Sequence, residues 1–227
     1  LFSAKQTGVP LGGVIAGVLA PPAAMAFGWQ AAPLTAAAAC IVLGFALESV
    51  RARWDFDRDR SALLADRPFA GVALVWRDVV LKRIALMSFC YSLAQVCLTT
   101  FLVTLLVEEA GFALVAAGFV LALVQAASVG GRLFWGWAAD RIGHGLALLA
   151  ALGLMTAICS LAVAGLTQAL GAGLLVALFV VFGFAAVGWN GVYLAEVARL
   201  APAGKISEAT GGCLFFTFLG VVVTPPL

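Results

Sequence analysis

The feature that most constrains this chain is a series of long apolar stretches, each long enough to cross a lipid bilayer as one helix. A crossing of the hydrocarbon layer, which is ~30 Å thick, needs roughly 20 helical residues. Stretches of this kind cover residues 8–27, 31–47, 84–107, 112–137, 146–166, 171–194 and 209–226. They lack the period-two alternation of membrane strands, so we expect helices, which satisfy their own backbone groups. The sequence therefore predicts an all-α polytopic membrane bundle with seven transmembrane helices.

The composition argues against the functions of soluble proteins. Hydrophobic residues occupy 64% of the 227 positions and charged residues only 11%, against about 25% in soluble domains. The five cysteines lie inside apolar stretches, without a Cys-x-x-Cys pair or a Cys/His cluster. The sequence also has no nucleophile triad, Walker loop or dinucleotide fingerprint. We therefore expect a protein that is not an enzyme and has no cofactor, no metal site and no nucleic-acid partner.

Residues 49–83 differ from the rest because they are rich in charge. Eight of the thirteen Lys and Arg residues gather between positions 48 and 83, interleaved with aspartates. Asp55, Asp57 and Asp59 have an alternate spacing that suggests a metal site, but the arginines between them would neutralise it. We expect instead a solvated linker with a short surface helix at residues 72–80.

The distribution of Lys and Arg predicts the orientation of the chain. These residues occur only in alternate connections, so the positive-inside rule places the linker, the turn at Arg141 and the loop from Arg199 to Lys205 in the cytoplasm. The N-terminus is then inside and the C-terminus outside. Because the chain starts without Met and stops within an apolar stretch, we expect it to be part of a longer protein.

One charged turn separates two long apolar stretches, and it contains Gly136, Asp140, Arg141 and Gly143. The glycines allow close helix approach and a tight bend. Asp140 is expected to accept hydrogen bonds from the first amides of the next helix, where the helix dipole favours an anion. One interpretation is a latch that stabilises one of two conformations. The alternative is a helix cap beside an arginine that snorkels to the interface.

Polar side chains within the apolar stretches are a second signal, because such groups are costly in hydrocarbon and usually face a cavity or a partner. Tyr91, Gln95 and Thr99 recur every four residues on one helical stripe, with Ser88 one turn earlier. The full candidate cavity set is Tyr91, Gln95, Thr99, Gln125, Arg132, Trp189, Asn190 and Tyr193. The alternative for each residue is an interhelical hydrogen bond of about 0.6 kcal/mol. Lys5 is a candidate for attracting an anionic solute, or a cationic anchor at the membrane surface.

The segment Gly136-x-x-x-Asp140-Arg141-x-Gly143-His144 resembles the signature loop of the major facilitator superfamily, although His144 and Gly145 replace the usual basic residues. The resemblance implies a carrier built from two six-helix halves, of which this chain would contain helices five to eleven. Residues 1–48 would be the last two helices of the N-terminal half, residues 49–83 the central cytoplasmic linker, and residues 84–227 the C-terminal half without helix twelve.

This resemblance implies a secondary active transporter that works by alternating access. We expect a symporter for a small organic solute, an anionic metabolite, with a proton as the coupling ion, acting as a monomer in the lipid bilayer of a bacterial inner membrane. One alternative is a proton-coupled exporter of drugs or hydrophobic compounds. Exporters of the family carry a Gly-Pro-x-x-Gly-Gly pattern, and in Gly8-x-Pro10-x-Gly12-Gly13 the proline is displaced by one residue. The other alternative is a transport-inactive membrane sensor with the same fold.

Overall fold

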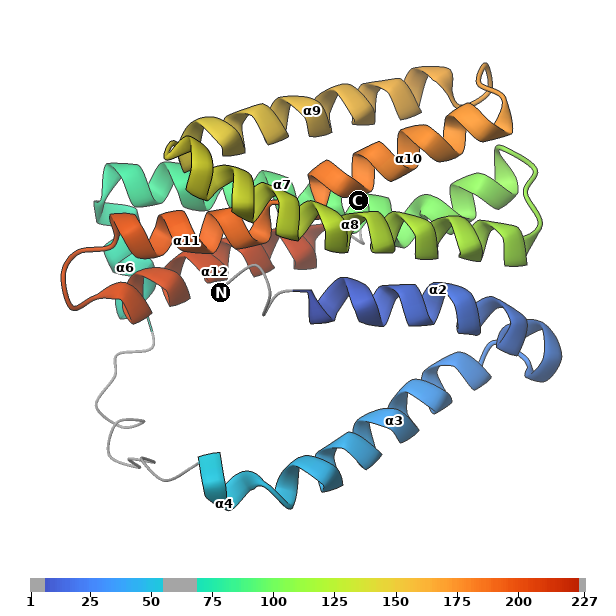
Figure 1. Cartoon of the computed structure of the whole chain (residues 1–227), viewed down its shortest axis with the longest axis horizontal. Coiled ribbons are helices and arrows are strands. Elements are labelled where there is room, and N and C mark those ends of the chain that lie inside the picture. Colours follow the sequence, from blue (N-terminus) through green and yellow to red (C-terminus); the bar gives the residue numbers. More distant parts are fainter. Residues whose placement is uncertain (1–6, 55–68, 225–227) are drawn as a thin grey trace.

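The computed structural model describes residues 7–54 and 69–224, and within them every regular element is a helix (Figure 1). In chain order these are α2 (Gly8–Phe27), α3 (Ala31–Glu48), α4 (Arg51–Trp54), α6 (Ala70–Arg77), α7 (Val79–Glu108), α8 (Leu114–Ile142), α9 (Gly145–Leu166), α10 (Ala172–Ala186), α11 (Asn190–Leu200) and α12 (Ile206–Val223). In the described residues, 7 helical spans are long and apolar enough to cross a membrane, with α10 and α11 forming one span together. The all-α prediction and the predicted number of transmembrane helices are therefore confirmed for this part of the chain.

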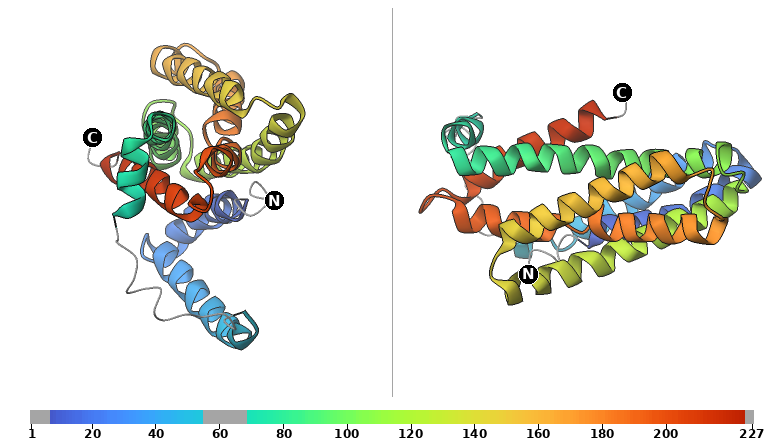
Figure 2. Two further views of the ribbon diagram at one scale, coloured as in Figure 1. Left: turned by 90° about the vertical axis from the view of Figure 1, so that its left-hand side faces the viewer. Right: turned by 90° about the horizontal axis from the view of Figure 1, so that it is seen from above.

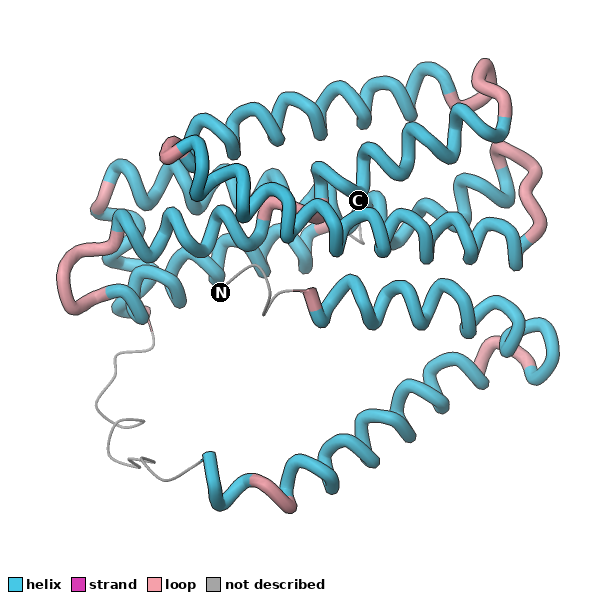
Figure 3. The backbone as a smooth tube through the Cα atoms, in the orientation of Figure 1, coloured by secondary structure: helices cyan, strands magenta, loops and turns pink. Residues whose placement is uncertain are grey.

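The long helices run back and forth along one direction, and short turns join them at the two ends of the bundle (Figures 1 and 3). One end holds the start of α7, the α8–α9 turn and the α11–α12 loop, drawn at the left of Figure 1. The Lys and Arg residues of the described connections gather there, and we call it the basic end. The α2–α3, α7–α8 and α9–α10 turns lie at the opposite end. The alternation of charged and uncharged connections along the sequence thus corresponds to the two ends of the bundle.

The linker leads into the bundle through a surface helix, α6, which ends at Arg77. Asp78 has extended backbone dihedrals (φ −87°, ψ 119°) and separates α6 from α7. Its Oδ1 accepts hydrogen bonds from the amides of Val80 and Leu81, both at 2.9 Å, so Asp78 is an N-cap. For this reason α7 begins at Val79 rather than at residue 84. The surface helix covers Ala70–Arg77, so it begins and ends earlier than the predicted range 72–80.

The charged turn after α8 is shorter than the sequence suggests. α8 continues to Ile142 and ends at Gly143, whose φ of +70° suits a residue without a side chain. Asp140 and Arg141 therefore lie in the last turn of α8. His144 occupies the N-cap position of α9 and makes no capping hydrogen bond with its side chain in the described part of the chain. The expectation that Asp140 caps the next helix is wrong, because the helix that carries Asp140 has not yet ended at that residue.

The core of the bundle consists of two apolar clusters. The cluster nearer the basic end includes Leu81, Leu149 and Val197, which are completely buried. The other cluster includes Leu102 and Leu106 of α7. Around these clusters α10 packs between α8 and α9, and α12 lies along α7 and against α6 (Figure 2).

The hairpin of α2 and α3 contacts this bundle through α2 alone, which lies along α8. At Gly17 the two backbones are so close that an added Cβ would lie 2.9 Å from the Gly118 carbonyl oxygen and the Ala122 amide nitrogen. Gly8 and Gly12, which the small-residue pattern also contains, have no described neighbour within 4 Å of such a Cβ. α3 diverges from the bundle (Figure 1), and none of its residues is buried.

Candidate functional site

The site is organised around an interruption between α10 and α11, at residues 187–189. Gly188 lies against α8, where an added Cβ would be 2.7 Å from Cδ1 of Trp135 and 3.2 Å from the Gly131 carbonyl carbon. The Trp135 indole Nε1 donates a hydrogen bond of 2.9 Å to the carbonyl oxygen of Phe184. That bond satisfies a carbonyl at the end of α10, and so the helix can stop within the membrane span.

At this interruption three of the sequence-predicted residues come together. The Gln95 Oε1 atom of α7 accepts hydrogen bonds from Trp189 Nε1 at 3.1 Å and from Asn190 Nδ2 at 3.2 Å. We call these three residues the polar node. The Gln95 amide nitrogen and the Asn190 amide oxygen make no hydrogen bond with the described residues. The node therefore keeps both a donor and an acceptor for a further polar group.

A separate cluster of hydroxyl groups lies deeper in the bundle and joins α7, α11 and α12. The Ser88 Oγ accepts hydrogen bonds from the Tyr193 hydroxyl at 3.0 Å and the Thr217 hydroxyl at 2.9 Å, and donates to the Ala85 carbonyl at 2.8 Å. Ser88 and Tyr193 are completely buried. The structure thus places Tyr193 in the packed interior, where its hydroxyl links helices.

The other two members of the predicted stripe are also engaged within the protein. The Tyr91 hydroxyl donates to the Leu149 carbonyl of α9 at 2.5 Å, and the Tyr91 ring stacks on Trp189 with centroids 4.8 Å apart. Thr99 donates to the Gln95 carbonyl of its own helix at 3.0 Å. Among the residues of the stripe, only Gln95 forms the hydrogen bonds of the polar node.

Gln125 and Arg132 lie on α8, two helical turns apart. The Gln125 side chain packs on Gly13 of α2, where an added Cβ would lie 2.7 Å from its Cδ. Its Oε1 is buried and accepts no hydrogen bond from the described residues. Arg132 is almost completely buried. Lys5, the remaining candidate for attracting a solute, lies outside the described residues.

At the basic end, Asp140, Arg141 and Gly143 of the signature segment are exposed, and Gly136 is half-buried. Arg141 lies with its guanidinium 5.8 Å from the centroid of the Trp137 ring, and the Asp140 side chain forms no hydrogen bond or ion pair with the described residues. A different carboxylate is buried beside the start of α9. An added Cβ at Gly145 would lie 2.6 Å from Cδ of Glu196, which also pairs with Arg199 at 2.6 Å.

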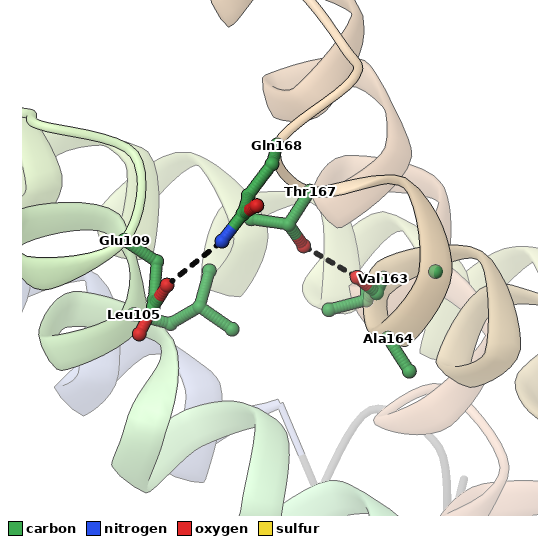
Figure 4. Close-up of a pocket in the computed structure, with 7 residues that line it drawn as sticks. Leu105, Glu109, Val163, Ala164, Thr167 and Gln168 are labelled. Carbon is green, nitrogen blue, oxygen red and sulfur yellow. Dashed lines mark hydrogen bonds between the residues drawn. The ribbon is translucent and has the colours of Figure 1, made fainter.

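The opposite end contains a pocket of about 330 Å³ between the end of α7 and the α9–α10 turn. Gln168 and Glu109 point toward each other across it (Figure 4), and Gln168 Nε2 donates to Glu109 Oε2 at 3.3 Å. This bond ties two turns of the bundle that lie far apart in the sequence.

Sequence reasoning missed two residues of the site. Thr217 carried a usable signal, because it is a hydroxyl within the apolar second half of α12. Trp135 carried none, since an aromatic residue near a membrane surface is ordinary. In the described residues no group of three His, Cys, Asp or Glu side chains has the arrangement of a metal site. Asp55, Asp57 and Asp59 lie outside these residues.

Comparison with known proteins gives one match. A family model described as Major Facilitator Superfamily matches residues 1–225. No curated protein and no solved structure matches the chain.

Proposed function

The chain belongs to the major facilitator superfamily and is a membrane transporter, and we propose that it moves a small organic solute by alternating access, driven by an ion gradient. The observation that carries this proposal is the polar node. Gln95, Trp189 and Asn190 meet where a membrane span is interrupted, and irregular backbone at such depth is tolerated where it lines a cavity or is buried in protein. The free donor and acceptor of the node would hold a polar solute.

The proposal of an anionic solute rests on Arg132. A cation buried within a membrane span is costly, and such residues pair with a partner and mark solute or ion pathways. Arg132 lies on α8, two turns from Gln125, and so adds positive potential to the α2-facing side of the bundle. We propose that Lys5, which lies outside the described residues, also attracts the anionic solute.

The signature segment is proposed to control conformation rather than to bind the solute. Gly136, Asp140, Arg141 and Gly143 lie at the basic end, where the exposed Asp140 carboxylate is available to a partner on the other half of a carrier. A pairing made in one conformation and broken in the other would set the rate of the transition between them.

The remaining features of the proposal concern the whole carrier. We propose that residues 1–48 belong to an N-terminal half, 49–83 to a cytoplasmic linker and 84–227 to a C-terminal half. The coupling ion is a proton, the carrier is a monomer, and its membrane is a bacterial inner membrane. The described part of this multi-pass protein has 7 spans.

Uptake by vesicles that contain the full-length protein tests the function. A panel of small organic anions and their neutral analogues is offered with and without an imposed pH gradient, and empty vesicles are the control. We expect saturable uptake of an anion that a gradient accelerates. Uptake of hydrophobic cations in inverted vesicles alone would indicate the exporter, and no transport of any solute under any gradient would indicate the sensor.

A further inference from the structure

The surface helix α6 has a fixed place at the basic end. It runs across the direction of the long helices (Figures 1 and 2) and packs on the first turns of α12. Val75 is completely buried in this contact. At Gly71 an added Cβ would lie 3.0 Å from the Gly212 amide nitrogen, so the two backbones touch. α6 is therefore docked as part of the bundle and lies in the plane that a membrane surface would take.

The exposed side of this region combines aromatic and basic side chains. Phe69 is 68% exposed and Trp76 is 55% exposed. Trp76 stacks on Phe216 at 5.9 Å between ring centroids, and Lys82 Nζ lies 5.5 Å from the Trp76 centroid. Exposed aromatic residues beside cations are typical of segments that lie at the headgroup level of a bilayer.

A pocket of about 490 Å³ opens between α6 and the start of α12. Its apolar wall comes from α6 and the residue before it, and its charged residues come from both helices and the loop. The lining residues are Phe69, Ala70, Ala73, Leu74, Arg77, Lys205 and Glu208. Two cations and one carboxylate give the pocket a net positive charge, next to an apolar wall.

We propose that this pocket binds an anionic phospholipid of the cytoplasmic leaflet. Arg77 and Lys205 hold the phosphate, and Phe69 and Leu74 contact the glycerol backbone and the first acyl carbons. Glu208 accepts a hydrogen bond from a headgroup hydroxyl, which favours a singly charged glycerol headgroup over a more highly charged one. Basic pockets on the cytoplasmic side of membrane helices are suited to anionic headgroups. The apolar wall is the reason to assign a lipid rather than a free phosphate ion.

Binding of phosphatidylglycerol to the purified full-length protein, followed by native mass spectrometry, tests the site. Phosphatidylcholine is the lipid control and inorganic phosphate the competitor. Each cation that contacts the bound headgroup should strengthen binding about fivefold, so the double variant Arg77→Gln with Lys205→Gln should bind phosphatidylglycerol about 25-fold more weakly. Arg83→Gln removes an exposed cation of the same region that does not line the pocket, and it should change binding less than about twofold.

A second variant keeps the charged residues of the pocket and fills the pocket with a larger side chain. Ala73→Trp should abolish phosphatidylglycerol binding with little change in melting temperature, because Ala73 is exposed and lines the pocket. Retention of the lipid by this folded variant would overturn the proposal. So would equal losses in the double variant and in Arg83→Gln, or displacement of the lipid by inorganic phosphate, which would identify a general anion site. None of these outcomes bears on solute transport.

Discussion

At the scale of single residues, Ser88 holds three helices together. Its Oγ is the acceptor for the Tyr193 and Thr217 hydroxyls, and all three side chains are buried. Ser88→Ala removes the shared oxygen through which the Tyr193 and Thr217 hydroxyls bond to α7. We expect a loss of about 1–3 kcal/mol in the free energy of unfolding, seen as a lower melting temperature of the full-length protein in detergent.

The matched control for this substitution is one turn away. Ser92 is also buried, but its hydroxyl donates only to the Ser88 carbonyl of its own helix, at 2.7 Å. Ser92→Ala should therefore leave the melting temperature almost unchanged. Equal effects of the two alanine substitutions on the melting temperature would show that the contacts between helices at Ser88 add nothing to the stability.

The sequence was enough to select the polar residues of the site, but it did not predict which residues they contact. Gln95, Trp189 and Asn190 stand out because polar groups in an apolar stretch are costly. The contact between them depends on the position at which α10 ends. The sequence of residues 171–194 instead predicts one continuous helix. At the interruption Gly188 packs against Trp135 of another helix, a contact that no local pattern contains.

At the scale of elements, the α2–α8 contact brings two helix backbones close together. Gly17→Ala would place a Cβ 2.9 Å from backbone atoms of Gly118 and Ala122, and neither can move aside alone. We expect the helices to separate at a cost of about 1–3 kcal/mol, measured by thermal unfolding. Gly12→Ala, which meets no described atom within 4 Å, should leave the stability unchanged or raise it slightly. A stable Gly17→Ala variant would contradict this packing.

The position of Asp140 at the end of α8 leads to a prediction about the rate of transport. Asp140 lies in the last helical turn and is exposed, so it is placed to form a contact that changes between conformations. Asp140→Asn should slow transport about tenfold with little change in KM, because it alters the transition and not solute binding. Initial uptake rates at several solute concentrations separate the two parameters. A selective rise in KM would mean that Asp140 belongs to the binding site.

The number of membrane helices was predictable because it depends only on the length and hydropathy of each stretch. Helix boundaries were harder to predict, since charged residues can extend a helix beyond the hydrocarbon layer. α7 starts at Val79 because Asp78 caps it, and α8 reaches Ile142 because Gly143 is the first residue that ends it. Both helices therefore carry their charges in regular turns beyond the apolar stretch.

At the scale of the whole molecule, the chain places a polar node within a bundle whose two ends differ in charge. The signature segment at residues 136–144 indicated the family, and the match over residues 1–225 confirms it. The arrangement around the node could not be derived from that segment. The segment lies at the end of α8, whereas the node is formed by Gln95 of α7, Trp189 of the interruption and Asn190 of α11.

The central claim is that the polar node binds the transported solute, and the KM of two variants tests it most directly. Gln95→Leu removes the acceptor of Trp189 and Asn190, whereas Thr99→Val changes a hydroxyl of the same stripe that is bonded only within α7. In vesicles with matched amounts of full-length protein, we predict that Gln95→Leu raises the KM at least about tenfold and Thr99→Val less than about twofold. Equal KM values for the two variants would contradict the claim.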